Sequence, residues 1–145
     1  MIRSITNGSK TIVASVGIAA GVANVPLPVI DTLGYTSVRI VALLGALTAT
    51  QQTSLAVQQS LDNGATDPFV LAPGATTPNA ADADSNKLLI LDVFKPHKRY
   101  LLPILNRATA NAAVTSVIYE LYNAQSEPVA SDVTVSQQLI VANPH

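Results

Sequence analysis

Apolar and polar residues alternate in short runs along most of the chain, and turn-forming residues separate the runs. Residues 53–60 show the alternation most clearly, because Leu55 and Val57 are flanked by small or polar side chains. A period of two places successive side chains on opposite faces of a β-strand, whereas a surface helix repeats about every 3.6 residues. Residues 37–47 are apolar on both faces, which indicates a strand buried on both, or buried on one with a partner covering the other.

Several further segments have strand-type sequence. Residues 87–94 and 98–106 alternate on either side of a turn at residues 95–97, and we predict that they form a hairpin. Pro103 has no N–H to donate, so it favours an edge position or a bulge for the second arm. Residues 133–141 alternate again and are expected to add a strand to this chain or to a neighbouring one. The other predicted strands are residues 11–18, 69–71 and 114–122.

Turn and loop signals fall between these runs. Asn63 and Gly64 suit a tight turn, since both tolerate a positive φ. Pro26 and Pro28 force extended geometry and withhold two ladder donors, which predicts a sheet edge or a path over another subunit. Residues 72–86 have no hydrophobic period, and we expect a loop that is mobile or used in contacts. The alanine-rich residues 19–23 and 108–113 could each form a single helical turn.

Seven or eight short strands with turns between them predict an all-β fold, a single antiparallel β-sandwich. The length of 145 residues suits one domain, and a chain of this size buries roughly 68–70% of its unfolded surface. The polar ends are expected to extend from this core. We therefore divide the chain into an N-terminal arm (1–10), a sandwich domain (11–125) and an extended C-terminal tail (126–145).

The composition is typical of a chain that lies against other proteins. Hydrophobic residues make up 48% of it and charged residues only 12%, about half the usual share. The net charge of −1 argues against a general electrostatic grip on nucleic acid. Cysteine is absent, which excludes disulfides and thiolate metal sites, and no apolar run is long enough for a membrane-spanning helix. Residues 11–23 mimic a signal peptide, but Thr, Ser and Gly interrupt them, so we interpret them as part of the mature chain.

Candidate catalytic and metal-binding groups are few. The two histidines are His97 and His145, so a two-histidine metal site would need the last residue to fold back. His97 and Asp92 could meet across the predicted hairpin, but no Gly-x-Ser-x-Gly elbow accompanies them. Asp82 and Asp84 lie on a loop without the spacing of an EF-hand calcium site. We therefore expect no enzymatic activity, no cofactor and no bound metal.

Five of the eight basic residues lie between positions 87 and 107. With Tyr100 they could form a basic–aromatic patch for RNA or phosphate. Two neighbours, Lys98 and Arg99, point to opposite sides of a strand, however, so they cannot belong to one continuous stripe. We therefore favour contacts with acidic residues of a protein partner. The five are Lys87, Lys95, Lys98, Arg99 and Arg107.

Three segments resemble the capsid cement or decoration proteins of tailed bacteriophages, a family of small virion proteins. The most specific is LDVFKPHKRYL at residues 91–101, which is similar to the family pattern D-V-[YF]-[RK]-P-x-K-R-Y. The others are GYTSV at 34–38, which leads into LGAL at 44–47, and VQQSLDNG at 57–64. The chain departs from the family at Leu61, where a second acid is expected, in an alanine-rich middle loop and in an added tail.

The resemblance implies a jelly-roll-like sandwich that oligomerises on the outer capsid surface, and that occupies the host cytoplasm during assembly. The implied partners are the major capsid protein and a second copy of the chain, with a homodimer favoured over a homotrimer. Neither a specific nucleic acid nor a membrane is expected as a partner. The alternative is a carbohydrate-binding β-sandwich module of a virion fibre or host-recognition protein. Such modules usually expose aromatic platforms, whereas aromatic residues make up only 4% of this chain.

The residues expected at the interface lie in the two arms, at the proline pair and in the 95–100 turn. Extended arms can pair with the strand edges of a neighbour, and several weak contacts together give a durable attachment. In the arms the expected residues are Arg3, Lys10, Val133, Val135 and Ile140. In the body of the domain they are Pro26, Pro28, Lys95, His97, Lys98, Arg99 and Tyr100.

Overall fold

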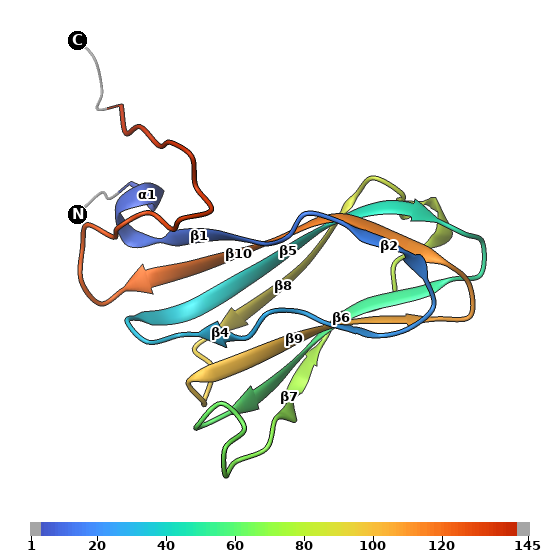
Figure 1. Cartoon of the computed structure of the whole chain (residues 1–145), viewed down its shortest axis with the longest axis horizontal. Helices are drawn as coiled ribbons and strands as arrows, with labels where there is room; N and C mark the ends of the chain where they lie inside the picture. The colour runs from blue at the N-terminus through green and yellow to red at the C-terminus, as the bar shows by residue number, and fades with distance from the viewer. Residues whose placement is uncertain (1–3, 142–145) are drawn as a thin grey trace.

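The computed structural model describes residues 4–141, and these residues are nearly all β-structure (Figure 1). They contain the helix α1 (Ile5–Gly8) and one short 3-10 turn (Asp82–Asp84). No helix in this part of the chain is long and apolar enough to cross a membrane. The strands are β1 (Lys10–Ser15), β2 (Ile18–Gly21), β3 (Val25–Pro26), β4 (Ile30–Asp31), β5 (Tyr35–Leu47), β6 (Gln52–Ser60), β7 (Val70–Thr76), β8 (Leu88–Phe94), β9 (Tyr100–Ala108) and β10 (Ala112–Ala124).

The strands form two antiparallel sheets. The β10 sheet has the order β1-β10-β5-β8, with β2 also paired to β10, and the β9 sheet has the order β3-β9-β6-β7, with β4 also paired to β9. Since β1 and β2 share one side of β10, and β3 and β4 share one side of β9, the chain occupies eight strand positions. It passes between the sheets in the order of a jelly roll, two interleaved Greek keys. The predicted antiparallel, jelly-roll-like β-sandwich is confirmed.

The core lies between the two sheets and is built by alternation. In β5, Val38, Ile40 and Leu44 are buried, and in β6, Leu55 and Val57 meet them from the other sheet. The outward residues of β5 are only half-buried, so within the described chain this strand is buried on one face and not on both. The other buried core residues are Leu27, Ile30, Ala42, Leu101, Leu105, Val114, Val117, Tyr119 and Leu121.

The predicted hairpin of residues 87–94 and 98–106 is wrong. Its first arm is β8, which pairs with β5 in the β10 sheet, and its second arm is β9, which pairs with β6 in the other sheet. The link between them therefore crosses from one sheet to the other. Lys95, with a φ of 52°, begins the crossing, and its N–H donates to Ser37 Oγ at 3.0 Å. Both arms are strands, as expected, but they do not pair with each other.

Other segments also differ from the predictions. Residues 11–18 form two strands, β1 and β2, because a bulge interrupts the pairing with β10. The predicted loop 72–86 begins as β7 and contains the 3-10 turn, and residues 19–23 contribute to β2 instead of a helical turn. Residues 133–141 form no strand within the chain. The described part of the N-terminal arm consists of α1 and the first residue of β1.

The prolines mark two positions where a donor is not needed. Pro26 ends β3 at the edge of the β9 sheet, as predicted from the proline pair. Pro103 lies in β9, an interior strand, so the predicted edge position is wrong. Its carbonyl accepts from Leu27 N at 2.9 Å, in the gap between β3 and β4. A residue in an antiparallel strand turns its N–H and C=O to the same side. The nitrogen of Pro103 therefore faces this irregular gap, where no carbonyl of a paired strand needs a donor from it.

Candidate protein interface

The outer face of the β10 sheet carries an apolar row that crosses all four strand positions. Val13 of β1 pairs with Ile118 of β10, which pairs with Val41 of β5, which pairs with Ile90 of β8. Paired residues share a face of the sheet. Next to this row, Leu43 pairs with Leu88, which is 57% exposed. The outer face is therefore apolar in its middle, where a surface sheet of a soluble domain is ordinarily polar.

A polar row borders the apolar one. Arg39 pairs in register with Glu120 on one side and Asp92 on the other, and its guanidinium lies 3.4 Å from the Glu120 carboxylate. Tyr122 Oη donates to Asp92 Oδ1 at 2.5 Å. Burial raises the pKa of the Tyr122 phenol, and the hydrogen bond to Asp92 raises it further. These contacts hold the charged side chains flat against the sheet, beside the apolar row.

β8 is an edge strand with an unpaired side. Six of its seven residues are apolar, and Phe94 at its end is 63% exposed. Most natural edge strands carry lysine, proline or a bulge, because an exposed apolar edge invites pairing with another chain. Asp92 is the one charged residue in β8, and its carboxylate accepts a hydrogen bond from Tyr122 of β10, on the far side of β5. β8 therefore has the features of a strand that another chain covers.

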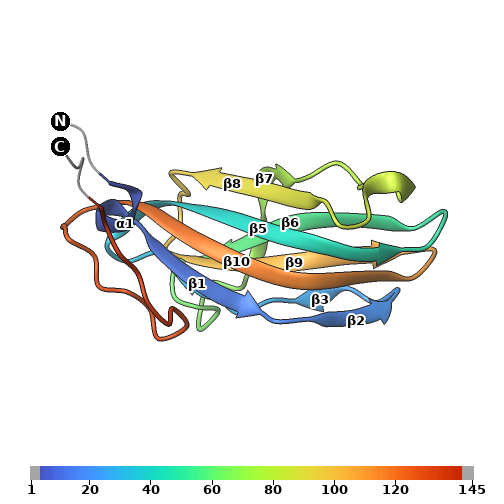
Figure 2. The same cartoon turned by 90° about the horizontal axis from the view of Figure 1, so that it is seen from above.

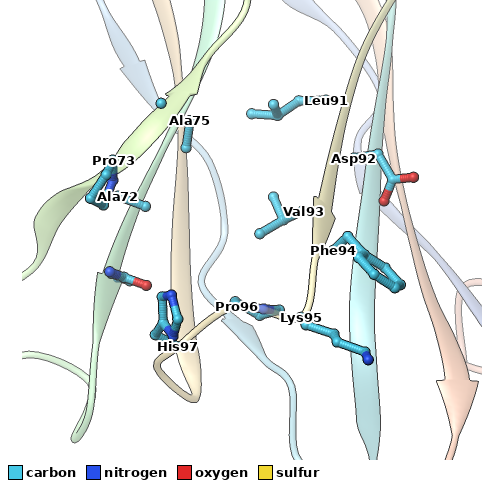
Figure 3. Close-up of a pocket in the computed structure, with 12 residues that line it drawn as sticks. Ala72, Pro73, Ala75, Leu91, Asp92, Val93, Phe94, Lys95, Pro96 and His97 are labelled. Atoms are coloured by element: carbon cyan, nitrogen blue, oxygen red, sulfur yellow. The ribbon is translucent and has the colours of Figure 1, made fainter.

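A groove of about 280 Å³ lies between the edge strands β7 and β8 (Figure 3). Its walls are mostly apolar, with Ala72 and Ala75 on one side and Leu91 and Val93 on the other. His97 lies at the end of the groove. No hydrogen bond joins β7 to β8 within residues 4–141, so the two edges are free to accept another backbone. The groove has a strand edge on each side and apolar side chains between them.

The 95–99 link is fixed at the end of this groove by two ion pairs. Lys98 Nζ lies 2.7 Å from Asp67 Oδ2, and this contact is the main cause of the lowered pKa of Asp67. Arg99 Nε and Nη2 donate to the two carboxylate oxygens of Asp31 at 2.7 and 2.8 Å. This bidentate bond lowers the pKa of Asp31 and raises that of Arg99.

The predicted basic patch is largely neutralised. Besides Lys98 and Arg99, Lys87 pairs with Asp84 at 3.0 Å. Arg107 is 8% exposed and donates to backbone carbonyls inside the sandwich, so it does not belong to any surface. Lys95 makes no ion pair with the described residues; its ammonium lies 5.2 Å from the centre of the Phe94 ring. Of the five basic residues that are clustered in the sequence, Lys95 alone is neither paired with a carboxylate nor buried among backbone carbonyls in the described part of the chain.

Asp92 and His97 do not form a catalytic pair. Figure 3 shows the Asp92 carboxylate directed away from the groove and the His97 ring on the opposite wall. The residue that contacts Asp92 is Tyr122, on the outer face. No three His, Cys, Asp or Glu side chains gather around a common point in the described part of the chain. The pair that the sequence offered as a hydrolytic site is therefore not assembled within residues 4–141.

The other predicted interface residues are dispersed. Lys10 pairs with Asp132 at 3.7 Å, and Pro26 and Pro28 are exposed on the edge of the β9 sheet. Tyr100 is half-buried, with the Arg99 guanidinium 4.9 Å from its ring centre. In the tail, Val133 and Ile140 are exposed, whereas Val135 is partly buried. Arg3 lies outside the described residues.

The residues that the sequence predictions missed are the outward apolar ones of β8 and β5. They are Leu88, Ile90, Phe94, Val41 and Leu43. A signal for them exists, since residues 87–94 are apolar on both faces and such a strand needs cover on both. The predicted hairpin obscured it by assigning a false neighbour to β8.

The chain matches no protein-family model and no curated protein. The features available for assigning a function are therefore the outer face of the β10 sheet, the unpaired β8 edge, the tail and the sequence resemblance of residues 91–101.

Proposed function

We propose that this chain is a non-enzymatic capsid cement protein of a tailed bacteriophage, which oligomerises on the outer capsid surface and bridges neighbouring major capsid proteins. The apolar outer face of the β10 sheet, together with the unpaired β8 edge, is the observation that carries the proposal. A contiguous exposed apolar patch of this kind marks a surface that contacts another protein. The resemblance of residues 91–101 to cement proteins supplies the class of partner.

The physical demands of the role fit this surface. A packaged genome presses outward on the shell, so a protein that bridges adjacent capsomers adds buried area that resists separation. Several modest contacts on one bridging oligomer act together, because each bound site raises the effective concentration of the next. The paired state of Lys98, Arg99 and Arg39 lowers the charge that association has to desolvate. It also leaves little basic surface for nucleic acid, in keeping with a purely protein partner.

Binding to empty shells tests the proposal. The purified chain is mixed with shells assembled from the major capsid protein of the same genome, and the bound fraction is measured by co-sedimentation. We expect saturable binding, and we expect Leu88→Gln/Phe94→Gln to weaken it about tenfold or more, because both side chains lie on the apolar face that would join the copies of a bridging oligomer. Val16→Gln is the matched control, since Val16 is 88% exposed but lies away from β8.

Two outcomes would overturn the proposal. Wild-type chain that does not bind shells contradicts it directly. A glycan array provides the second test: reproducible binding that Phe94→Ala abolishes would replace capsid attachment by the carbohydrate-binding alternative. Phe94 is the suitable probe because its ring is exposed, although the Lys95 ammonium lies over it.

A further inference from the structure

The outer face of the β10 sheet is complementary to itself. A two-fold axis parallel to the strands would place each row of one copy against the same row of a second copy in reverse order. In the apolar row, Val13 would then face Ile90, and Ile118 would face Val41. In the polar row, Arg39 of one copy would face Glu120 of the other, and the reverse. Both apolar and charged positions are matched by this single operation, as an isologous interface requires.

The C-terminal tail provides a second unpartnered feature. Residues 135–141 have a strand-type sequence without charge, proline or glycine, yet they form no strand. Leu139 is 83% exposed and Val141 is also exposed, so no described residue covers them. Apolar strand-type sequence of this kind is ordinarily paired or shielded in a folded protein.

The start of this tail is anchored at β1, on the opposite edge of the sheet from β8. Val13 N donates to Thr134 Oγ1 at 3.0 Å, and Asp132 pairs with Lys10. Figure 2 shows the tail beside β1 and α1, at the same end of the molecule. Residues 135–141 reach at most about 25 Å. To reach β8 of its own chain, the tail would have to cross the outer face of the sheet. This path covers about 14 Å across three strand spacings, in addition to the rise over the side chains. Almost no tail residues would then remain to pair with β8.

We propose that two copies pack the outer faces of their β10 sheets together about this axis, and that the end of each tail adds as a strand to β8 of the other copy. In this arrangement β1 of one copy faces β8 of the other across the usual sheet separation of about 10 Å. About three residues span that distance, which leaves residues 138–141 to pair with β8. Leu139, Ile140 and Val141 then lie against the β8 edge and its groove.

The interface area explains why the tail is needed. Four strands of about seven residues each give an outer face with an outline of about 450 Å² per copy. A stable interface ordinarily buries about 800 Å² per partner. The face alone is therefore too small, and the added strand supplies backbone hydrogen bonds and further apolar area. The occupant of the β8 edge is in this view a second copy of the chain.

This inference deepens the self-association part of the proposed function and does not depend on the capsid. Its test uses the full chain alone in solution, and sedimentation equilibrium measures the dimer dissociation constant. We expect wild-type chain to dimerise, and Ile90→Lys and Leu139→Asp each to weaken the dimer about tenfold or more, because each places an unpaired charge at the apolar contact. Both positions are exposed in the single chain, so the urea midpoints should be unchanged at a concentration where all chains are monomeric.

A double variant separates strand donation from the other ways of covering β8. In Ile90→Lys/Leu139→Asp, each lysine on β8 meets an aspartate on the partner's tail, so dimerisation should recover to within about threefold of wild type. Val16→Lys and Ser131→Asp are controls that carry the same charges at exposed positions outside the contact, and they should dimerise as wild type does. Dimers that form by direct pairing of two β8 strands would tolerate Leu139→Asp and would not recover in the double variant.

The remaining outcomes also decide the inference. A monomeric wild-type chain overturns it, whether β8 is covered by a foreign protein or by the chain's own tail. If the chain binds shells but stays monomeric, only the self-association inference fails; if it dimerises as described but binds no shells, only the capsid proposal fails. Because the chain has no cysteine, Asp92→Cys in one copy and Val141→Cys in another, which lies on the same face of the tail strand as Leu139, can be oxidised together. A disulfide between the two different chains would support the arrangement, and disulfides between Asp92→Cys chains alone would contradict it.

Discussion

The two open sides of the sandwich are held together in different ways. On the side where β2 and β3 lie, side chains bridge the sheets: Arg107 of β9 donates to the carbonyls of Ala19 and Ala112, and Tyr119 of β10 donates to the carbonyl of Pro28. We call this the bridged side. A cavity of about 420 Å³ lies between its edge strands β1 and β4, beside the bond from Tyr119 to Pro28.

On the other side, between β7 and β8, no hydrogen bond crosses in the described residues. The connection from β7 to β8 closes one end of this unbridged side, where Gln51 Nε2 donates to Ala80 O at 2.9 Å. At the other end, the contact between Lys98 and Asp67 ties the 95–99 link to the loop after β6. Between these ends, the groove is lined by apolar side chains of both strands, among them Ala72 and Ala75 of β7 and Leu91 and Val93 of β8.

The difference separates stability from association. The bridged side carries buried polar groups whose loss leaves carbonyls without donors, so it determines whether the two sheets stay together. The unbridged side has unpaired strand edges and few hydrogen bonds within the chain, so another strand can add there. Mutations on the bridged side should therefore lower the free energy of unfolding. Mutations on the unbridged side should instead weaken binding to another chain.

The largest effect is expected from Arg107→Met. The substitution keeps an apolar stem but removes the donors to the carbonyls of Ala19, Ala23 and Ala112, at distances of 2.7–2.8 Å. Because Arg107 is buried and its bonds are charge-assisted, the free energy of unfolding should fall by about 3–4 kcal/mol, as measured by urea titration. Arg39→Met is the matched control, since its ion pair is partly exposed and should contribute less than about 1 kcal/mol. Equal losses of unfolding free energy in the two variants would show that the bridged side contributes no more to stability than the surface ion pair.

Tyr119→Phe should have a smaller effect. It removes one donor from the Pro28 carbonyl, a 2.8 Å bond between the sheets, without changing the ring that packs in the core. Burial raises the pKa of the Tyr119 phenol, so the group is a neutral donor at physiological pH. The free energy of unfolding should fall by about 1 kcal/mol. Tyr122→Phe loses a bond on the outer face, and its free energy of unfolding should fall by less. A larger loss in Tyr122→Phe than in Tyr119→Phe would contradict the difference between the two sides.

The long strands could be predicted from the sequence, but the partner of β8 could not. Alternation identified β6, β8 and β9, because a period of two is a local property. The pairing of β8 was wrong because a five-residue link suits either a hairpin turn or a crossing between sheets. The choice depends on groups distant in sequence: Ser37 accepts from Lys95 N, and Thr32 donates to the Arg99 carbonyl.

The candidate interface shows the same limit. Arg107 shares a strand face with Leu101 and Leu105, so its burial follows from alternation. Whether Lys98 and Arg99 are free or paired does not, because Asp67 and Asp31 come from remote loops. A pattern along one strand indicates which face is apolar, and only the assembled sheets show that the outer face of β8 remains uncovered.

A third prediction concerns Asp62 in the loop after β6, next to the unbridged side. Bonds from Thr66 and from the Asp67 N–H lower its pKa to about 2. A carboxyl whose pKa is lower in the folded state than in the unfolded state stabilises the fold above about pH 4, and this contribution disappears as the pH falls through about 2. Asp62→Asn should therefore lower the melting temperature at pH 7, and the difference from wild type should shrink steadily as the pH falls from about 4 to below about 2. A difference that persists at pH 2 would contradict this assignment.

The smallest effect is expected from Lys98→Met, which opens one end of the unbridged side. The Lys98–Asp67 contact is partly exposed, so its loss should change global unfolding very little, and the change should shrink further in about 1 M salt. Its effect should instead be local: amide hydrogen exchange in β7 and β8 should accelerate, while exchange in β10 stays the same. Lys95→Met is the matched control, because Lys95 contacts no carboxylate of the described residues. If both variants left exchange in β8 unchanged, the unbridged side would be held by its apolar contacts alone, and the ion pair would have no part in keeping the groove closed.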